Sequence, residues 1–485
     1  MALIGRIPSN FGNLTFLVCL DLGSNNFHGN LPQEMTCLRR LKFLDLSFNN
    51  FRGEVPSWFG FLQKLQVLNL RNNSFTGSIP SFSNMSTLQT LNLAFNSLEG
   101  HIPVSLSNAS RLETLELSYN SLQANIPEWI SSLHNMNSLG IEYTQLVGSI
   151  PFTIFSISRI EVVAFTGNSL SGSLPNGLCN GLPILKGLYL SINKLRGHMP
   201  TSISNCSQLQ ILSLSKNEFD GPIHSEIGRL SNLQILELRA NHFTGIIPQE
   251  IGNLVNLAKL GMEDNQITGS VPISIFNISS LQVLSLWQNN LSGLLPGEIG
   301  EIPKEIRNLV ELRILDLGNL TVLYLYYNPL NGMLPASTGN LSTSLRKFYG
   351  YNCKIKGRIP KEVGNLSSLL DLVLSGNNLV RSIPTSIGNL RNLQRINLSD
   401  NKLTGLIGDH ICKLQHLGDI YLGQNQLLGS LPNCLGNITS LSEIHLGSNK
   451  LSSNIPPILG NLQDLVVLDL SSNNMVGSLP PEIGI

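Results

Sequence analysis

The sequence has little charge of either sign. Charged side chains make up 13% of its 485 residues, and 31 Lys and Arg residues are balanced by 31 Asp and Glu residues. A chain without net charge has no long-range field that would attract a nucleic acid or an anionic membrane surface. We therefore expect no nucleic-acid partner.

Long apolar runs and cysteines are also scarce. No window approaches the roughly 18 unbroken apolar residues that a membrane-spanning helix needs, so the chain as given is predicted to be soluble. Seven cysteines in this length do not make a disulfide-rich scaffold, and the sequence alone assigns no disulfide. A hydrophobic content of 42% nevertheless excludes intrinsic disorder.

Catalytic and metal-binding motifs are missing too. The sequence has no Walker-type phosphate loop, no H-E-x-x-H, no G-x-S-x-G and no set of kinase motifs. His410, Cys412 and His416 come nearest to a metal cluster, but their spacing matches no common zinc pattern. We interpret Cys412 as structural filler, and Cys206 and Cys353 as small buried residues. The sequence therefore predicts no enzyme, no cofactor and no metal site.

One repeated string, in contrast, is abundant. A chain of 485 residues is too long for a single compact core, and L-x-L-x-x-N recurs along it with a period of 24 residues. Successive spacings are 23, 24 or 25 residues, with one exception. The last position of the string falls at Asn25, Asn49, Asn73, Asn96, Asn120, Thr144, Asn168, Asn193, Asn217, Asn241, Asn265, Asn289, Asn328, Cys353, Asn377, Asn401, Asn425, Asn449 and Asn473.

Each part of the string has a physical role. In Leu91-Asn92-Leu93 the leucines alternate with an exposed residue, as in a short half-buried strand, and one strand per repeat builds a parallel sheet. A buried Asn offers a donor and an acceptor, so a column of Asn side chains satisfies backbone groups of neighbouring repeats. Thr144 and Cys353 fill this position with fewer hydrogen bonds. No repeat buries its leucines alone, so stacking supplies the core.

The string is usually followed by L-x-G-x-I-P, as in residues 98–103. At this point the chain resembles the plant-type leucine-rich-repeat family. The resemblance implies an α/β repeat solenoid: a right-handed leucine-rich-repeat superhelix with a concave parallel β-sheet and about nineteen 24-residue turns. We treat residues 1–485 as a single such domain, truncated at both ends, because residues 3–8 start halfway through a turn and Ile485 lies inside another.

One spacing is irregular, because 39 residues separate Asn289 from Asn328. Two explanations stay open: a looped-out insertion within one turn, or in-frame losses that join partial turns. We favour the losses, because part of the intervening sequence itself has the repeat pattern. The sequence predicts an irregular turn at 290–327. Two leucine pairs define it: Leu323 and Leu325 in the strand, and Leu315 and Leu317 in the bulged connection.

Aromatic residues are few, at 6%, but five tyrosines and one tryptophan fall on three neighbouring predicted strands. The leucine pattern turns these positions toward solvent on the concave face. Rigid aromatic rings facing water are typical of binding hot spots, whereas cross-strand stacking that only stabilises the sheet is the alternative. The predicted ligand-binding residues are Glu237, Arg239, Lys259, Glu263, Asp264, Trp287, Tyr324, Tyr326, Lys347, Tyr349 and Tyr351.

Two further groups on the same face are given structural interpretations. The first combines two glutamates with scattered rings that mostly stand before a repeat asparagine: Phe48, Phe95, Glu116, Tyr119, Glu142 and Tyr143. The second is interpreted as a solvated face, with contact to a co-receptor as the alternative: Asp371, Arg395, Asp400, Asp419, Tyr421, Glu443, His445 and Asp469.

The sequence contains twelve N-x-S/T sequons, of which roughly eight are expected by chance. The excess is weak evidence for secretion. We predict no glycan at Asn397, which lies between the core residues Ile396 and Leu398 at the two strand-leucine positions. The glycosylation candidates are Asn84, Asn108, Asn205, Asn277, Asn340, Asn365 and Asn437.

The resemblance is strongest to ectodomains of plant leucine-rich-repeat receptor-like kinases. It implies recognition of a peptide or protein ligand on the concave face, in defence or development, outside the plasma membrane. It also implies a parent with one membrane span and a Ser/Thr kinase, and a possible leucine-rich-repeat co-receptor kinase. Some members bind a peptide carboxylate with two Arg on adjacent strands, but Arg239 stands alone here.

Three other interpretations stay open. The chain could come from a kinase-less receptor-like protein or a truncated gene product. It could also be a secreted inhibitor that resembles polygalacturonase-inhibiting proteins, although those have about half as many turns. The paired-cysteine caps of these families are not found in the sequence.

Overall fold

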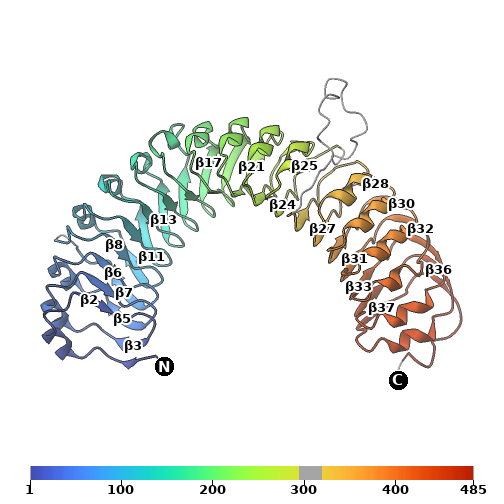
Figure 1. Cartoon of the computed structure of the whole chain (residues 1–485), viewed down its shortest axis with the longest axis horizontal. Helices are drawn as coiled ribbons and strands as arrows, with labels where there is room; N and C mark the ends of the chain where they lie inside the picture. The colour runs from blue at the N-terminus through green and yellow to red at the C-terminus, as the bar shows by residue number, and fades with distance from the viewer. Residues whose placement is uncertain (1, 83, 294–318, 484–485) are drawn as a thin grey trace. The chain divides into compact units, whose positions relative to one another are not determined.

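The computed structural model describes residues 2–82, 84–293 and 319–483. Contacts within the chain divide it into two compact units. Unit 1 comprises Met1–Gly221 and Arg229–His242, and unit 2 comprises Pro222–Gly228 and Phe243–Ile485. Figure 1 shows that both consist of stacked, similar turns, in agreement with the repeat pattern.

The main sheet of unit 1 is parallel and follows chain order. The first leucine of each L-x-L lies opposite the first leucine of the next repeat, as in Leu20, Leu44 and Leu68, so the leucines form a continuous buried column. Its ten strands among the described residues are β2 (Cys19–Asp21), β4 (Phe43–Asp45), β6 (Val67–Asn69), β8 (Thr90–Asn92), β10 (Thr114–Glu116), β12 (Ser138–Gly140), β14 (Val162–Ala164), β16 (Gly187–Tyr189), β18 (Ile211–Ser213) and β20 (Ile235–Glu237).

The main sheet of unit 2 has the same construction. Nine strands are described: β22 (Lys259–Gly261), β24 (Val283–Ser285), β26 (Val322–Tyr324), β27 (Lys347–Tyr349), β29 (Asp371–Val373), β31 (Arg395–Asn397), β33 (Asp419–Tyr421), β35 (Glu443–His445) and β37 (Val467–Asp469). The described strands thus match the nineteen predicted turns.

The strand predicted after the irregular spacing is confirmed. β24 pairs directly with β26, and Leu323 and Leu325 are buried. Asn328 takes the repeat-asparagine position, because its side chain bonds to the carbonyls of Leu286 and Leu325. Leu315 and Leu317, and with them the choice between insertion and loss, lie outside the described residues.

A second set of short parallel strands follows the repeat asparagine in each turn. In unit 1 these are β1 (Ile4–Gly5), β3 (Asn26–Gly29), β5 (Asn50–Glu54), β7 (Ser74–Ser78), β9 (Ser97–Gly100), β11 (Ser121–Asn125), β13 (Gln145–Ser149), β15 (Ser169–Gly172) and β17 (Lys194–His198). β19 (Glu218–Pro222) and β21 (His242–Thr244) span the unit boundary. Unit 2 has β23 (Thr268–Gly269), β25 (Asn290–Leu291), β28 (Lys356–Gly357), β30 (Asn378–Arg381), β32 (Lys402–Leu406), β34 (Gln426–Gly429), β36 (Lys450–Ser453) and β38 (Asn474–Met475).

The glycine and proline of L-x-G-x-I-P start the return path. Gly100 has φ 79°, which favours glycine, and the ring of Pro103 fixes φ at −71° just before a 3₁₀ helix. The described 3₁₀ helices are η1 (Ser9–Asn13), η2 (Gln33–Cys37), η3 (Ser57–Phe61), η4 (Val104–Asn108), η5 (Glu128–Ser132), η6 (Phe152–Ser156), η7 (Leu178–Gly181), η8 (Thr201–Asn205), η9 (Ser225–Arg229), η10 (Gln249–Asn253), η11 (Ile273–Asn277), η13 (Ala336–Asn340), η14 (Lys361–Asn365), η15 (Thr385–Asn389), η16 (Ile411–Lys413), η17 (Asn433–Asn437) and η18 (Pro457–Asn461). Among the described residues, no helix combines the length and apolar character of a bilayer span.

The repeat asparagines form the predicted hydrogen-bonded ladder. The Asn217 amide nitrogen donates to the carbonyl oxygens of Leu190 and Leu214, at 2.9 and 3.0 Å, and its oxygen accepts the Leu195 N–H at 3.0 Å. Cys353 occupies the same position with fewer partners: its Sγ lies 3.3 Å from the carbonyl oxygen of Leu325, and burial raises the pKa of this thiol to about 12. An asparagine of this kind therefore joins its own repeat to the preceding one.

Candidate functional site

Three adjoining strands of unit 2 bring the predicted aromatic residues together. The register of β24, β26 and β27 places Ser285, Tyr324 and Tyr349 side by side. Two residues after the end of each strand come Trp287, Tyr326 and Tyr351. We call Trp287, Tyr324, Tyr326, Tyr327, Tyr349 and Tyr351 the aromatic cluster.

The rings of the aromatic cluster stack across the strands. Trp287 and Tyr326 have ring centroids 4.9 Å apart and planes within 11°, and Tyr326 stacks on Tyr351 at 4.3 Å and 9°. A second contact joins Tyr324 to Tyr349 at 5.2 Å. These side chains are half-buried, and Tyr327 at the edge is 51% exposed. The cluster is thus two rings wide and partly open to solvent.

Burial raises the pKa of three hydroxyl groups in the aromatic cluster, those of Tyr326, Tyr349 and Tyr351. Burial, with Tyr351 as the next cause, raises the pKa of Tyr326 to about 12. Burial and a hydrogen bond to Asp371 raise the pKa of Tyr349 further, and the Tyr349 hydroxyl donates to Asp371 Oδ2 at 2.8 Å. The cluster therefore offers apolar rings together with neutral hydroxyl groups, a combination that suits a peptide.

The structure brings only some of the predicted charged residues to the cluster. Lys347 begins β27, where it is half-buried and lies opposite Asp371 of β29. Lys259 is exposed at the start of β22, whereas Glu263 is only 8% exposed. Asp264 accepts a hydrogen bond from Gln288 at 3.0 Å.

The two remaining predicted residues belong to the other unit. Glu237 ends β20, Arg239 follows it, and both side chains are half-buried. Because they lie in unit 1, they are not placed with the aromatic cluster. The candidate site is therefore formed by residues of unit 2.

The rings that the sequence analysis called scattered also stack, which corrects that interpretation. Phe95 and Tyr119 lie 4.1 Å apart and Tyr119 and Tyr143 4.7 Å apart, with interplanar angles of 13° and 23°. The Arg71 guanidinium lies 4.6 Å from the centre of the Phe95 ring. Each ring directly precedes a ladder residue, and stacked repeats superimpose equivalent positions.

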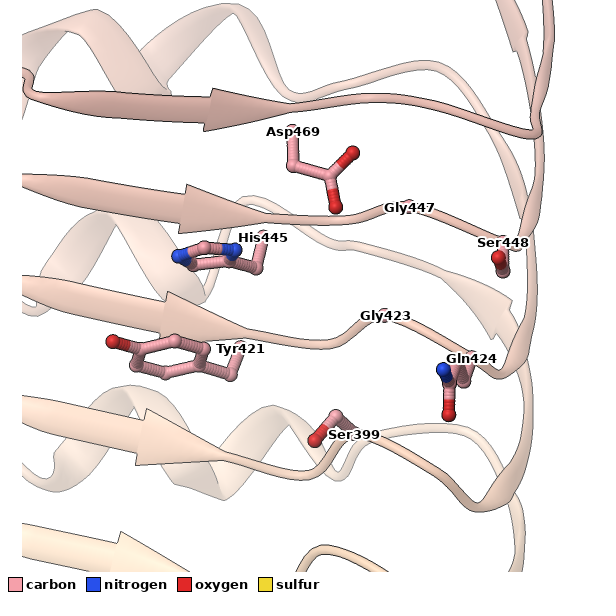
Figure 2. A pocket seen from close by; sticks show the side chains of 8 residues that line it. All are labelled: Ser399, Tyr421, Gly423, Gln424, His445, Gly447, Ser448 and Asp469. Carbon is pink, nitrogen blue, oxygen red and sulfur yellow. The ribbon is translucent and has the colours of Figure 1, made fainter.

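A hollow on β31 to β37 of unit 2 contains Tyr421, His445 and Asp469, which the sequence analysis interpreted as part of a solvated face. Figure 2 shows a groove that crosses the strands, with a cavity volume of about 240 Å³. Its lining combines a Tyr–His pair and one carboxylate with small residues: Ser399, Tyr421, Gly423, Gln424, His445, Gly447, Ser448 and Asp469. The signal was in the sequence, because the residue after the second strand leucine is small in three consecutive repeats.

A neighbouring hollow of about 400 Å³ is lined by Asp371, Gln394, Arg395, His416, Gly418 and Asp419. Arg395 and Asp419 form an ion pair within it, with 2.7 Å between Nη2 and Oδ2. The charged groups of this second hollow thus partly neutralise each other.

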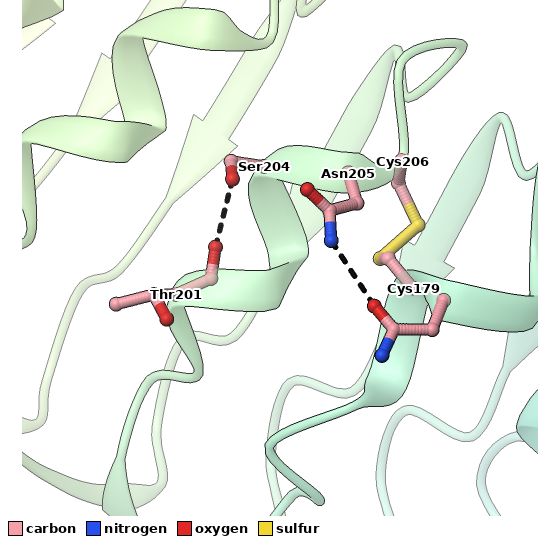
Figure 3. Close-up of a disulfide and its surroundings, with 6 residues drawn as sticks. Cys179, Thr201, Ser204, Asn205 and Cys206 are labelled. Carbon is pink, nitrogen blue, oxygen red and sulfur yellow. Dashed lines mark hydrogen bonds between the residues drawn. A yellow bond between two sulfur atoms is a disulfide. The ribbon is translucent and has the colours of Figure 1, made fainter.

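Two disulfides correct the interpretation of the cysteines. Cys179 of η7 is bonded to Cys206 after η8, as Figure 3 shows, and Cys412 of η16 is bonded to Cys434 of η17. The partners lie 27 and 22 residues apart, close to one repeat, so stacking brings their Cα atoms to 5.2 and 5.8 Å. Cys353 is buried with a free thiol. A cysteine spacing close to the repeat period was the signal in the sequence for both disulfides.

The predicted glycosylation candidates all have exposed side chains. Six of the seven end a 3₁₀ helix, as Asn108 ends η4 and Asn340 ends η13. Asn205 donates a hydrogen bond to Asn180 at 3.1 Å beside the Cys179–Cys206 disulfide (Figure 3). Asn397, in contrast, ends β31 on the main sheet, where its oxygen accepts a bond from the Ser399 hydroxyl at 2.7 Å.

Family comparison agrees with the stacked repeats. The model described as "Leucine-rich repeat region" matches residues 2–166, 181–317 and 352–481, and "Leucine Rich Repeat" matches 319–341. The chain belongs to the leucine-rich-repeat family. A comparison with curated protein sequences found no match.

Solved structures of plant receptors resemble this leucine-rich-repeat chain. The plant peptide hormone receptor RGFR1 in complex with RGF2 is 34% identical, with a TM-score of 0.85, covering 99% of this chain and 78% of that one. The Arabidopsis HAESA ectodomain with an extended IDA peptide is 32% identical, with a TM-score of 0.88 and coverages of 99% and 79%. HAESA with IDA and the co-receptor SERK1 is 29% identical, with a TM-score of 0.79 and coverages of 99% and 74%. The fold is thus that of a leucine-rich-repeat ectodomain, a typically non-catalytic scaffold for ligand recognition.

Proposed function

We propose that this chain is the extracellular ligand-recognition domain of a plant leucine-rich-repeat receptor-like kinase, and that a peptide or protein ligand binds the open face of the unit 2 main sheet at the aromatic cluster. The resemblance to plant leucine-rich-repeat ectodomains predicts that this face is concave. The partly exposed double row of rings on β24, β26 and β27 carries the proposal. Large, rigid rings bury much area while few rotatable bonds are frozen.

Two further observations support the proposal. Similar ectodomains form complexes with peptide hormones, and one of these complexes also contains a co-receptor. Disulfides persist in oxidising compartments, so the two cystines fit a secreted or cell-surface domain. We extend the proposal to a leucine-rich-repeat co-receptor kinase as a second partner, and to a parent that is anchored in the plasma membrane.

The experiment selects peptides from a displayed random library on the immobilised chain and then tests alanine variants. At least one of the variants Trp287→Ala, Tyr324→Ala and Tyr349→Ala should lower the affinity for the selected peptides by about 2 kcal/mol, roughly 30-fold. Tyr189→Ala is the matched control, because Tyr189 occupies the same strand position in β16 of unit 1.

Melting temperatures decide between recognition and mere stacking. If the rings only stabilise the sheet, the cluster variants will melt earlier while their peptide affinity stays unchanged. Peptides that bind equally well to all four variants would contradict the proposed site.

The sequence of the complete transcript distinguishes the proposed receptor kinase from a kinase-less receptor and from a secreted inhibitor. A downstream apolar span followed by kinase motifs supports the proposed parent. A span with a short tail selects the receptor-like protein, and a stop codon without a span selects the inhibitor or a truncated product. Whether the pathway serves defence or development requires a plant that lacks the gene.

A further inference from the structure

The groove on β31 to β37 has a built floor and two walls (Figure 2). Ser399, Gly423 and Gly447 occupy the same position in three consecutive repeats and form the floor. The parallel rings of Tyr421 and His445, 4.6 Å apart, line one side. Gln424 and Ser448 line the other side, each in a left-handed backbone conformation just before a ladder asparagine.

Glycine at position 447 is required by the carboxylate above it. A Cβ atom there would lie 2.6 Å from Asp469 Oδ2, so any side chain would push the carboxylate away. A Cβ at Gly423 would lie 3.1 Å from the carbonyl oxygen of Gly447. The two glycines thus keep the floor low and allow the Asp469 carboxylate to lie over it.

The Asp469 carboxylate is held in one orientation. The Ser471 N–H and hydroxyl both donate to Oδ1, at 3.0 and 2.7 Å, while Oδ2 lies over Gly447. These hydrogen bonds lower the pKa of Asp469, with His445 as a smaller cause, so the carboxylate stays ionised. A fixed, ionised oxygen therefore faces the groove.

The surroundings of the groove are acidic. Glu443 accepts a hydrogen bond from the Tyr421 hydroxyl and lies 3.2 Å from His445 Nε2. Asp419 is the third carboxylate, and it holds the guanidinium of Arg395 at 2.7 Å. The three carboxylates on β33, β35 and β37 thus outnumber Arg395, whose charge is already neutralised by Asp419. This excess of negative charge favours a cationic group as ligand.

The length of the groove matches a short extended peptide. Its lining comes from four neighbouring strands, so at about 4.8 Å per strand it is roughly 14 Å long. An extended chain advances about 3.4 Å per residue, so roughly four residues span it. Glycine residues in the floor allow the backbone of such a segment to approach closely.

Building on the proposed recognition function, we propose that this groove binds an extended segment of about four residues, and that an arginine side chain of the segment pairs with Asp469 beside the ring of His445. The planar guanidinium stacks on aromatic rings and can donate a charge-assisted hydrogen bond to the free Oδ2 of Asp469. An ammonium group has no planar face to stack on the ring of His445, so arginine is preferred to lysine.

The test uses two probes, acetyl-Gly-Gly-Arg-Gly-amide and the same peptide with citrulline, which keeps the shape of arginine without its charge. Ligand-observed NMR titration of the whole chain should show the arginine peptide binding about tenfold more tightly. Asp469→Asn should remove this preference, because the amide keeps an oxygen for Ser471 but loses the charge. Asp464→Asn is the control, since Asp464 is an exposed carboxylate outside the groove lining.

A second variant guards against a trivial result. Gly447→Ala leaves the charge in place but displaces the carboxylate, and it should reduce the preference as well. No binding of the arginine peptide, equal binding of both peptides, or a preference that survives Asp469→Asn would each overturn the proposal.

The test is independent of the aromatic cluster, which lies on other strands. Trp287→Ala should leave the preference of the short probe for arginine intact. One outcome is that the cluster variants leave the affinity for the library peptides unchanged while Asp469→Asn still removes the preference for arginine. That result would refute the proposed cluster site and support the groove. The reverse pattern refutes the groove alone.

Discussion

Both units carry a row of stacked aromatic rings, but the rows occupy different positions in the repeat. In unit 1, Phe95, Tyr119 and Tyr143 directly precede the ladder residue, where each has a positive φ. In unit 2, Tyr324 and Tyr326 alternate with strand leucines, so their rings stand on the open face of the sheet. Stacking alone therefore does not identify a binding surface. The unit 2 cluster differs because it is two rings wide.

Replacing ladder residues next to the two rows of rings should give the largest loss of stability. Asn120, next to Tyr119, bonds to the carbonyl oxygens of Leu93 and Leu117 at 3.0 Å, and it also accepts the Leu98 N–H at 2.9 Å. Asn120→Ala should cost about 3 kcal/mol of unfolding free energy, since each buried group left unpaired costs about 1 to 3 kcal/mol. Cys353 takes the ladder position two residues after Tyr351. Cys353→Ala should cost about 1 kcal/mol of unfolding free energy, because the thiol makes weaker hydrogen bonds than an asparagine amide.

Denaturant unfolding of both ladder variants measures this difference. Ser215→Ala serves as the control and should be near neutral, because its hydroxyl makes a single long contact, 3.5 Å to Glu237. Equal losses for Asn120→Ala and Ser215→Ala would refute the ladder argument.

The two rows of rings should differ in how much they contribute to peptide affinity. Tyr326→Ala removes the central ring of the unit 2 stack and should cost about 2 kcal/mol of affinity for library-selected peptides. Tyr119→Ala removes the central ring of the unit 1 stack and should leave this affinity unchanged. Calorimetric titration of both variants is the measurement, and a similar loss for Tyr119→Ala would remove the distinction between the rows.

Alkaline pH should weaken the unit 2 cluster. The pKa of Tyr326 is raised to about 12 by burial, above its ordinary value of 10. A group whose pKa is raised by folding adds stability below the unfolded pKa and loses it as pH rises toward the folded one. We expect the melting temperature to fall between pH 10 and about 12, and less steeply in Tyr326→Phe. An unchanged slope in that variant would contradict the burial of this hydroxyl.

Glycosylation gives the smallest expected effect on stability. If the protein passes through the secretory pathway, Asn108 and Asn340 should carry glycan, because both are exposed at the ends of 3₁₀ helices. Asn397 should carry none, because it lies on the main sheet and its oxygen binds Ser399. Mass spectrometry of glycopeptides measures occupancy, and full occupancy of Asn397 would exclude ligand binding on that part of the sheet.

Much of the fold was predictable from the repeat string. The positions of the strands, the ladder asparagines and the buried leucines follow from periodicity within each repeat, because every turn has the same local pattern. The strand at Leu323 and Leu325 was predictable for this reason, even beside the irregular spacing. The placement of Tyr324 beside Tyr349 follows from the same register.

The floor of the groove shows where the prediction stopped. Gly423 and Gly447 carry no functional side chain, so neither residue by itself indicates a binding site. Their role depends on what stands nearby: Asp469 lies over Gly447 only because the next strand brings it there. A search for small residues at one repeat position would have indicated the hollow but not its charge.

The sequence by itself determined the leucine-rich-repeat fold, the ladder and the face on which each side chain lies, because these depend on spacing within a repeat. Tertiary structure decided which side chains touch across repeats: the stacking of Tyr326 on Tyr351, the bond from Tyr349 to Asp371, and the Cys179–Cys206 disulfide. Such contacts join residues about 24 positions apart. They depend on register, rotamer and burial together, which no single repeat contains.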